Sequence, residues 1–120
     1  MTHRKGRLPK LMLSVPFEKR RETAQRLQLK YPGMVLLIIE SPDFVFQKTQ
    51  FVVDPEKKIW EMMFDIKRMS GFSASEPMVA ITYADIVAPS TWTMAELYSH
   101  YYSRDGFLYL RILKTDNGFG

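Results

Sequence analysis

The chain has 120 residues, 46% of them hydrophobic and 25% charged, which is typical of one folded globular domain. It contains no cysteine, so a disulfide framework, a thiol nucleophile and a cysteine-ligated metal site are excluded. The longest fully apolar run, Met34–Ile39, is much shorter than the roughly 20 residues that a membrane-spanning helix needs. We therefore expect a single-domain, cytoplasmic protein.

The net charge of +4 is distributed unevenly along the chain. Residues 1–30 hold nine Lys and Arg but two acids, whereas residues 31–120 hold eight Lys and Arg and eleven acids. Such a basic amino-terminal arm either approaches an anionic partner or is simply a solvated face. A nucleic-acid-binding module is one alternative, and it would use Arg4, Lys5, Arg7, Lys10, Lys19 and Arg26. Because aromatic residues are not interleaved with these basic ones, as base stacking requires, we expect no nucleic-acid partner.

The first third of the chain predicts an irregular terminus, a helix and a strand. Thr2–Lys10 is polar and basic, and we expect it to lack regular structure. Pro16–Tyr31 follows the periodicity of an amphipathic helix, and its predicted apolar stripe consists of Phe17, Ala24, Leu27 and Tyr31. Pro32 and Gly33 end that helix, and Met34–Glu40 then reads as a strand that is covered on both faces.

The middle of the chain predicts a short strand, Gln50–Val53, followed by a second helix over Glu56–Met69. Asp54 is expected to cap this helix and Pro55 to occupy its first position. The apolar residues of the helix recur at helical spacing and are expected to face the core: Ile59, Met62, Met63 and Ile66, with Trp60 and Phe64 at the margins.

The last third predicts a buried strand at Met78–Thr82, a helix over Thr93–Tyr102 and a strand at Phe107–Leu113. Thr93 and Glu96 have the spacing of a capping box. In the last strand, alternate residues are expected to face opposite sides of a sheet. Lys114–Gly120 is polar and contains glycine, so we expect it to project as a flexible tail.

This order of elements favours an α+β fold with helices over one face of a sheet. A ubiquitin-like β-grasp has the order, although other small α+β folds share it. No catalytic or metal-binding motif is present: the chain lacks H-E-x-x-H, G-x-S-x-G, a phosphate-binding loop and a dinucleotide fingerprint. We therefore expect a protein that is not an enzyme and that needs no cofactor or metal.

Five motifs, in the same order, resemble those of the autophagy ubiquitin-like modifiers, which include the GABA-receptor-associated proteins and the microtubule-associated light chains. The motifs are P-F-E-x-R from Pro16, K-Y-P from Lys30, the strand Gln50–Val53, T-M-x-x-L-Y from Thr93 and D-x-F-L-Y from Asp105. The chain also ends in Phe119-Gly120, like the processed forms of that family.

The resemblance implies a ubiquitin-like β-grasp over residues 31–113, preceded by a basic helical extension over residues 1–30 and followed by a conjugation tail over residues 114–120. It further implies conjugation of the Gly120 carboxylate to phosphatidylethanolamine by activating and conjugating enzymes, with Phe119 helping to recognise the tail. A cysteine protease would process or deconjugate the protein. The lipidated form would lie on the autophagosome membrane and bind cargo receptors.

Receptor binding in this family occurs by strand addition of a W/F/Y-x-x-L/I/V motif. The resemblance places the receiving edge at Gln50, Phe51, Val52 and Val53. It implies a first pocket formed by Leu27, Ile38, Val52 and Phe107, and a second formed by Phe51, Val53, Met62 and Ile66. Lys48 is expected to pair with acids that flank the motif.

The chain also departs from the family pattern. Leu36 replaces a usual proline, Gln50 replaces a basic residue, and the loop after Glu40 is shorter. Lys57 and Asp65 stand where apolar residues of the second pocket are expected, so the motif preference should differ from that of familiar members. An adaptor that binds motifs but is never conjugated is therefore a second interpretation.

Overall fold

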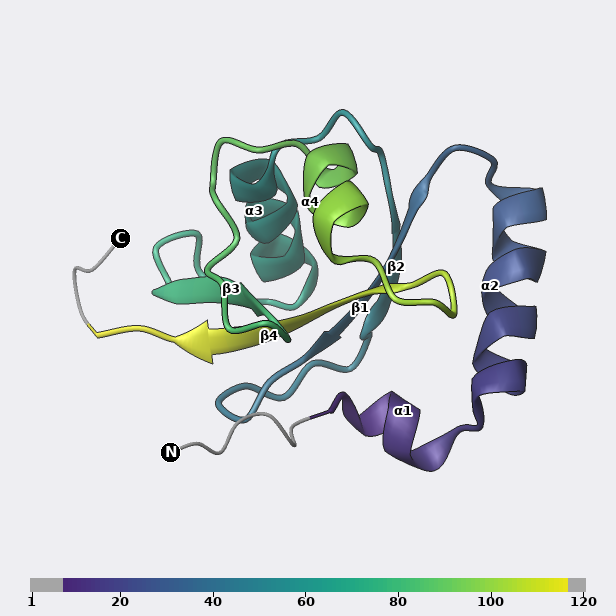
Figure 1. Cartoon of the computed structure of the whole chain (residues 1–120). Coiled ribbons are helices and arrows are strands. Elements are labelled where there is room, and N and C mark those ends of the chain that lie inside the picture. The colour runs from purple at the N-terminus through teal and green to yellow at the C-terminus, as the bar shows by residue number, and fades with distance from the viewer. Residues whose placement is uncertain (1–7, 117–120) are drawn as a thin grey trace.

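The computed structural model describes residues 8–116, which form one four-stranded sheet with helices on both of its faces (Figure 1). The elements are α1 (Lys10–Ser14), α2 (Phe17–Lys30), β1 (Val35–Glu40), β2 (Gln50–Val53), α3 (Ile59–Met69), β3 (Met78–Thr82), α4 (Met94–Tyr101) and β4 (Leu108–Lys114). The predicted α+β class is confirmed. The prediction that helices cover one face is wrong, because α3 and α4 lie on one face while α1 and α2 lie on the other.

The strands are ordered β2-β1-β4-β3, so β1 and β4 form the centre of the sheet. These two strands are parallel, whereas β2 and β3 run antiparallel to their neighbours. The prediction that β1 is covered on both faces is confirmed, since Val35–Ile39 are all buried. β3 was expected to be buried but is an edge strand, so only Ala80 and Thr82 of its residues are fully buried.

The outer edge of β3 is partly covered by the chain that follows it. The Thr82 N–H donates to the Ile86 carbonyl at 2.9 Å, and the Ala88 N–H donates to the Ala80 carbonyl at 2.9 Å. Residues 86–88 therefore form hydrogen bonds with outward-facing backbone groups of β3 that could otherwise pair with another strand.

The sheet separates two apolar layers, because side chains alternate between its faces. The layer under α3 and α4 includes Leu37, Ile39, Phe51, Met62, Ile66, Leu97, Leu108, Leu110 and Ile112. The layer under α1 and α2 is smaller and contains Ala24, Leu36, Ile38, Phe107 and Tyr109, with Leu27 and Val52 packed against it. The predicted alternation of the last strand is confirmed by this division.

Few apolar side chains of α2 reach the sheet. Of its predicted stripe, Ala24 is buried and Leu27 half-buried, but Phe17 and Tyr31 are each 38% exposed. Arg20 occupies the same side of the helix and is buried instead. The prediction for Phe17 and Tyr31 was wrong, because the buried contact of α2 is confined to Arg20 and Ala24 in the first two-thirds of the helix.

A buried ion pair compensates for this small apolar contact. The Arg20 Nε donates to Asp105 Oδ2 at 2.8 Å, and the two side chains are 9% and 0% exposed. The Arg20 guanidinium also donates to the Val15 carbonyl, and Asp105 accepts further hydrogen bonds from the Tyr109 hydroxyl and the Phe107 N–H. The network therefore ties α2 to the turn that leads into β4, and burial beside Asp105 raises the pKa of the Tyr109 phenol above its ordinary range.

Gly106 allows α2 to approach this turn closely. Its φ angle is +101°, and a Cβ atom built there would lie 3.0 Å from the Ala24 Cβ. Any other residue at this position would be strained and would push α2 away from the sheet.

The start of α3 differs from the sequence-based expectation, whereas the start of α4 agrees with it. Asp54 does not cap α3; its Oδ1 accepts from the Glu56 N–H at 2.8 Å and closes a turn before the helix. The N-cap residue is Lys58, whose backbone N–H donates to the Glu61 side chain at 2.9 Å. The predicted capping box of α4 is confirmed by reciprocal hydrogen bonds between Thr93 and Glu96.

Helix α1 was not predicted, and Lys10, expected to be irregular, begins it. No residue of this five-residue helix is buried. Its first backbone N–H groups, those of Lys10 and Leu11, donate to the Glu40 carboxylate at 2.8 and 3.1 Å. The Tyr83 hydroxyl donates to the same carboxylate, so Glu40 holds α1 at the carboxyl end of β1.

We expect Asp105→Asn to lower the free energy of unfolding by about 3–5 kcal/mol, because it leaves the buried Arg20 without a counter-charge. Urea denaturation measures the loss. The control is Glu18→Gln, which breaks the exposed pair with Arg21 and should cost less than about 1 kcal/mol. Equal losses in the two variants would contradict a structural role for the buried pair.

Candidate functional site at the β2 edge

β2 lies at one edge of the sheet, and two of its residues turn their backbone groups outward. The Ile39 N–H donates to the Thr49 carbonyl at 2.8 Å, which fixes the alternation of hydrogen-bonded pairs between β1 and β2. The backbone N–H and C=O groups of Phe51 and Val53 are therefore hydrogen-bonded to β1, while those of Gln50 and Val52 point away from the sheet. This edge can accept a further strand.

On the α2 side of the edge, the four residues expected to form the first pocket belong to one apolar cluster. Ile38 and Phe107 are buried at its base, and Leu27 and Val52 are half-buried above them. The structure brings these four residues together. The Lys48 ammonium is exposed and lies 5.1 Å from the centre of the Phe51 ring, which belongs to the layer on the other face. The roles of all five residues in binding a motif remain predictions.

On the α3 side of the edge, a cavity of about 100 Å³ opens between β2 and α3. Its lining includes all four residues expected in the second pocket, together with Leu37, Val52, Asp54, Lys57, Asp65 and Met69. Leu37, Asp54 and Met69 were not predicted to line a pocket, and Val52 was predicted to line the first pocket only. Leu37 could have been found from strand alternation, because it pairs with Phe51 and shares its face of the sheet.

The two charged lining residues form an ion pair. Lys57 Nζ lies 2.5 Å from Asp65 Oδ2, and Arg68 lies 3.3 Å from the other carboxylate oxygen. The hydrogen bond between them raises the pKa of Lys57 above 10.5 and lowers the pKa of Asp65 below 3.8, in each case against a smaller effect of burial. Both side chains are therefore charged at neutral pH.

The two apolar sites flank β2 on opposite faces of the sheet. A strand added to this edge would direct residues an odd number of positions apart toward opposite faces. A motif with two spacer residues between its anchors satisfies this condition, so both anchors could be seated by one extended peptide.

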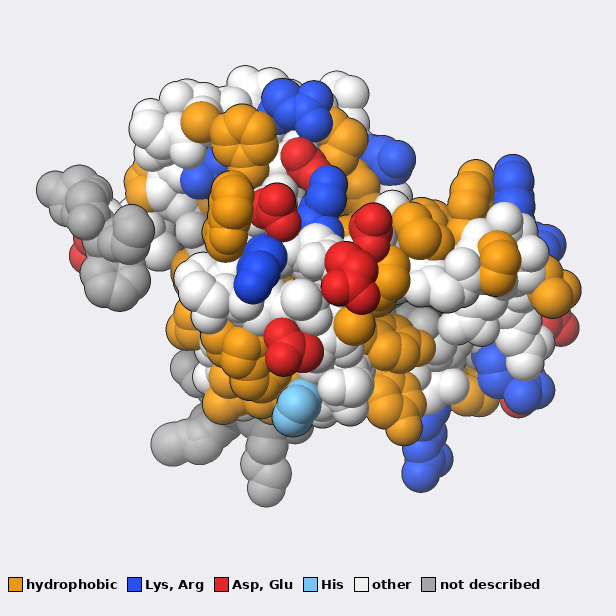
Figure 2. All heavy atoms as spheres, turned by 90° about the horizontal axis from the view of Figure 1, so that it is seen from above, with side chains coloured by type: hydrophobic (Ala, Val, Ile, Leu, Met, Phe, Trp, Pro, Cys, Tyr) orange, Lys and Arg blue, Asp and Glu red, His pale blue; other side chains and the backbone are white. Residues whose placement is uncertain are grey.

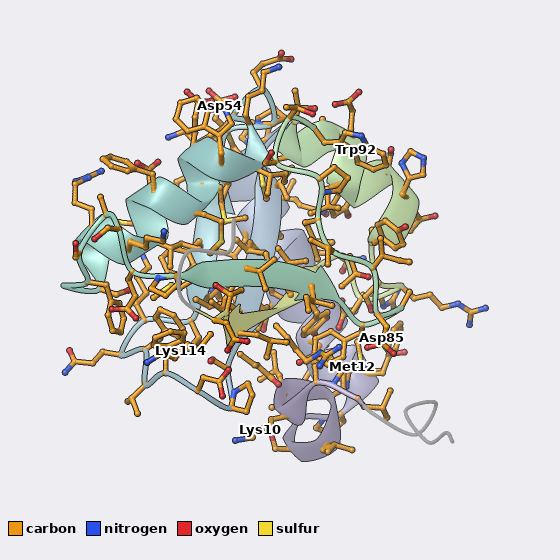
Figure 3. All side chains as sticks on the ribbon, turned by 90° about the vertical axis from the view of Figure 1, so that its left-hand side faces the viewer. Lys10, Met12, Asp54, Asp85, Trp92 and Lys114 are labelled. Atoms are coloured by element: carbon orange, nitrogen blue, oxygen red, sulfur yellow. The ribbon has the colours of Figure 1, made fainter. Side chains whose placement is uncertain are left out.

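The remaining predicted residues lie elsewhere. Phe119 and Gly120 fall outside the described residues, as do Arg4, Lys5 and Arg7. Of the other basic residues, Lys10 begins α1, while Lys19 and Arg26 are exposed on α2. Figure 3 labels Lys10 and Met12 on α1 and Asp54 beside the start of α3, at the opposite end of the molecule.

A larger cavity, of about 390 Å³, lies between α3 and β3. Trp60 and Phe64 line it and are 55% and 46% exposed, so their predicted place at the margin of the core was wrong. Over residues 8–116 no group of His, Asp and Glu is arranged to hold a metal ion. None of the helices in this part of the chain is long and apolar enough to cross a membrane.

Sequence comparison and structure comparison both find similarity to autophagy-related protein 8. No family model matches the chain. Autophagy-related protein 8 of Dictyostelium discoideum is 25% identical to this chain over 111 residues, which are 88% of each chain. Autophagy-related protein 8 of Schizosaccharomyces pombe is 29% identical over 108 residues, which cover 87% of this chain and 88% of that one. The crystal structure of Trypanosoma brucei ATG8 superposes with a TM-score of 0.82 at 25% identity, covering 95% of this chain and all of that one. These matches support an Atg8/GABARAP-family ubiquitin-like protein.

A second Atg8 structure, that of Plasmodium falciparum Atg8 in complex with a Plasmodium falciparum Atg3 peptide, has a TM-score of 0.75. It is 23% identical and covers 88% of this chain and 95% of that one, so it supports the fold alone. The resemblance inferred from the five motifs and the predicted ubiquitin-like fold are thus confirmed, and the chain is an autophagy ubiquitin-like protein.

We expect Asp65→Asn to destabilise the protein by up to about 1 kcal/mol at neutral pH, because the pair that it breaks is partly exposed. The pKa of Asp65 is lowered in the folded state, so its contribution is present above the unfolded value near 3.8 and is lost as the pH falls through the folded value. Urea denaturation at neutral and acidic pH should show the difference from wild type shrinking in acid. Glu56→Gln, at an exposed residue of the same loop, is the control, and a difference that stays constant with pH would contradict the assignment.

Proposed function

We propose that this protein is conjugated through Gly120 to phosphatidylethanolamine, takes part in autophagosome formation and binds cargo receptors by strand addition at β2. The observation that carries the proposal is the β2 edge of an Atg8-family fold, with the backbone groups of Gln50 and Val52 facing outward and an apolar site on each face. In this proposal, receptors carry the family's W/F/Y-x-x-L/I/V motif, Lys48 pairs with acids beside it, and the chain has no catalytic residue, cofactor or metal.

The conjugation route requires other proteins. Activating and conjugating enzymes would transfer the Gly120 carboxylate through thioesters on their own cysteines to the lipid amine, which suits a chain without cysteine. The Plasmodium falciparum Atg8 bound to an Atg3 peptide supports a conjugating enzyme as a direct partner. A cysteine protease would process or deconjugate the protein.

The proposal divides the chain by role. Residues 31–113 are the ubiquitin-like body, residues 1–30 its basic extension and residues 114–120 the conjugation tail, with Phe119 recognised beside Gly120. The protein is cytoplasmic until the two acyl chains of the lipid anchor it to the autophagosome membrane.

Reconstitution tests the conjugation directly. The full chain, the two enzymes, ATP and vesicles containing phosphatidylethanolamine should give an ATP-dependent mass gain of one phospholipid on the peptide that contains Gly120. If no adduct forms while the same enzymes modify another Atg8-family protein, the conjugation proposal fails and an unconjugated adaptor remains.

The variant Gly120→Ala is expected to keep the fold, because residue 120 lies beyond the packed elements described here, and to abolish lipid conjugation. Intact mass after reconstitution measures conjugation, and thermal unfolding measures the fold. The control is Asn117→Ala, which changes the tail without changing its end. Normal conjugation of Gly120→Ala would contradict the role of the terminal residue.

The variant Val52→Pro is expected to weaken binding of a motif peptide at least tenfold, because proline removes the outward N–H of β2 but none of its hydrogen bonds to β1. Fluorescence anisotropy with a labelled Trp-x-x-Leu peptide measures the affinity, and thermal unfolding checks the fold. The control is Val52→Ala, which keeps the N–H. Unchanged binding by Val52→Pro would place the peptide elsewhere than on this edge.

A further inference from the structure

We propose that the cavity between β2 and α3 selects a motif side chain that is neutral and ends in both a hydrogen-bond donor and an acceptor, with glutamine as the best fit, over the aliphatic residues of the usual motif. The inference rests on the proposed strand addition at β2 and concerns only the second anchor of the motif. It follows from the chemistry of the charged residues that line the cavity.

The cavity is apolar on one side and charged on the other. Phe51, Val53, Met62 and Ile66 contribute apolar side chains, whereas Asp54, Lys57 and Asp65 contribute charged ones. The Lys57 and Asp65 side chains are 35% and 25% exposed, so solvent reaches both of them. A peptide side chain that fills the cavity would shield them from solvent and must replace the hydrogen bonds that solvent offers.

The ion pair is fixed from two elements of the fold. The Lys57 backbone lies in the turn before α3, where its N–H donates to the Asp54 carbonyl at 3.1 Å and its carbonyl accepts from the Met94 N–H at 2.8 Å. Asp65 lies on α3, and Arg68 holds its second oxygen from one turn further along. The pair therefore presents its charges at a defined place instead of moving aside for an apolar residue.

Charges of both signs surround the cavity. The carboxylates of Asp54 and Asp65 and the ammonium of Lys57 line it, Arg68 contacts the second oxygen of Asp65, and the Glu61 carboxylate also acts on Lys57. Figure 2, which views the α3 and α4 side of the molecule, shows acidic and basic side chains lying close together on this surface. A charged motif residue would meet a like charge as near as an opposite one, so this arrangement favours a neutral residue.

An aliphatic residue would pack against the apolar side of the cavity. It would also desolvate the Lys57–Asp65 ion pair without forming a hydrogen bond to either group, which costs binding free energy. A glutamine places its two methylenes against the apolar residues, while its amide oxygen accepts from Lys57 and its amide N–H donates to Asp65. Each of these groups has hydrogen-bonding capacity beyond the contact with its ion partner, since an ammonium has three donors and a carboxylate has four acceptor positions.

The test compares three labelled peptides that differ in one position, Trp-x-x-Gln, Trp-x-x-Leu and Trp-x-x-Ala, on the full wild-type chain by fluorescence anisotropy. We expect the Gln peptide to bind about tenfold more tightly than the Leu peptide, which is one net hydrogen-bond contribution. A fourth peptide, with Ala in place of Trp, reports whether the first anchor is engaged. The wild-type comparison needs no variant and so does not depend on a variant's folding.

The double variant Lys57→Leu/Asp65→Leu should reverse the order, with the Leu peptide binding more tightly. The matched control is Lys58→Leu, which removes the neighbouring exposed lysine and should leave the order unchanged. Thermal unfolding of each variant checks its fold.

The outcomes separate this inference from the proposed function. Tighter binding of the Leu peptide to the wild-type chain, or an unchanged order in a folded double variant, overturns the inference but leaves strand addition intact. Binding of none of the peptides, or equal binding with and without Trp, overturns the inference together with strand addition at β2.

Discussion

The buried pair of Arg20 and Asp105 is the contact on which the amino-terminal part of the molecule depends. α2 buries only Arg20 and Ala24, so apolar packing alone holds it weakly on the sheet. The ion pair, with its hydrogen bonds to the Val15 carbonyl and the Tyr109 hydroxyl, fixes both the position of the helix and the path of the chain before it. Because a buried charge is costly when unpaired, the helix has one orientation in which both charges are satisfied.

That orientation determines what surrounds the β2 edge. The α2-side cluster exists only while α2 lies against Phe107, and Gly106 permits that approach by carrying no side chain. The α3-side cavity is set by the larger apolar layer and does not depend on α2. The two sites beside β2 are therefore supported by separate halves of the core, which meet only through the sheet.

The sequence predicted the elements well where the information was local. The strands and the longer helices follow hydrophobic periodicity, and the capping box of α4 is contained in four residues. Features that depend on distant partners were missed. Arg20 is buried because Asp105 lies beside it 85 positions later, and α1 forms because Glu40, 30 positions later, accepts from its first N–H group. Trp60 has the spacing of a core residue, but its side chain is 55% exposed and lines the open cavity between α3 and β3.

For the candidate site, the resemblance to a known family predicted residues that the structure does bring together, whereas the ion pair between Lys57 and Asp65 is seen only in the folded structure. In the sequence, Lys57 and Asp65 are two separate departures from the apolar residues expected in the second pocket. As neighbours 2.5 Å apart they are one neutral unit, and this relation between positions eight residues apart cannot be read from helical periodicity. The tail residues Phe119 and Gly120 were identified by resemblance and lie outside the described structure.

The segment that folds back along β3 has a consequence for stoichiometry. Its hydrogen bonds to Ala80 and Thr82 take up part of the second edge of the sheet, whereas the outward backbone groups of Gln50 and Val52 on β2 have no such partner within residues 8–116. Under the proposed function, one molecule would then bind one extended peptide at β2. Avidity for a receptor with several motifs would arise from the density of lipidated molecules on one membrane and from the linkers within the receptor.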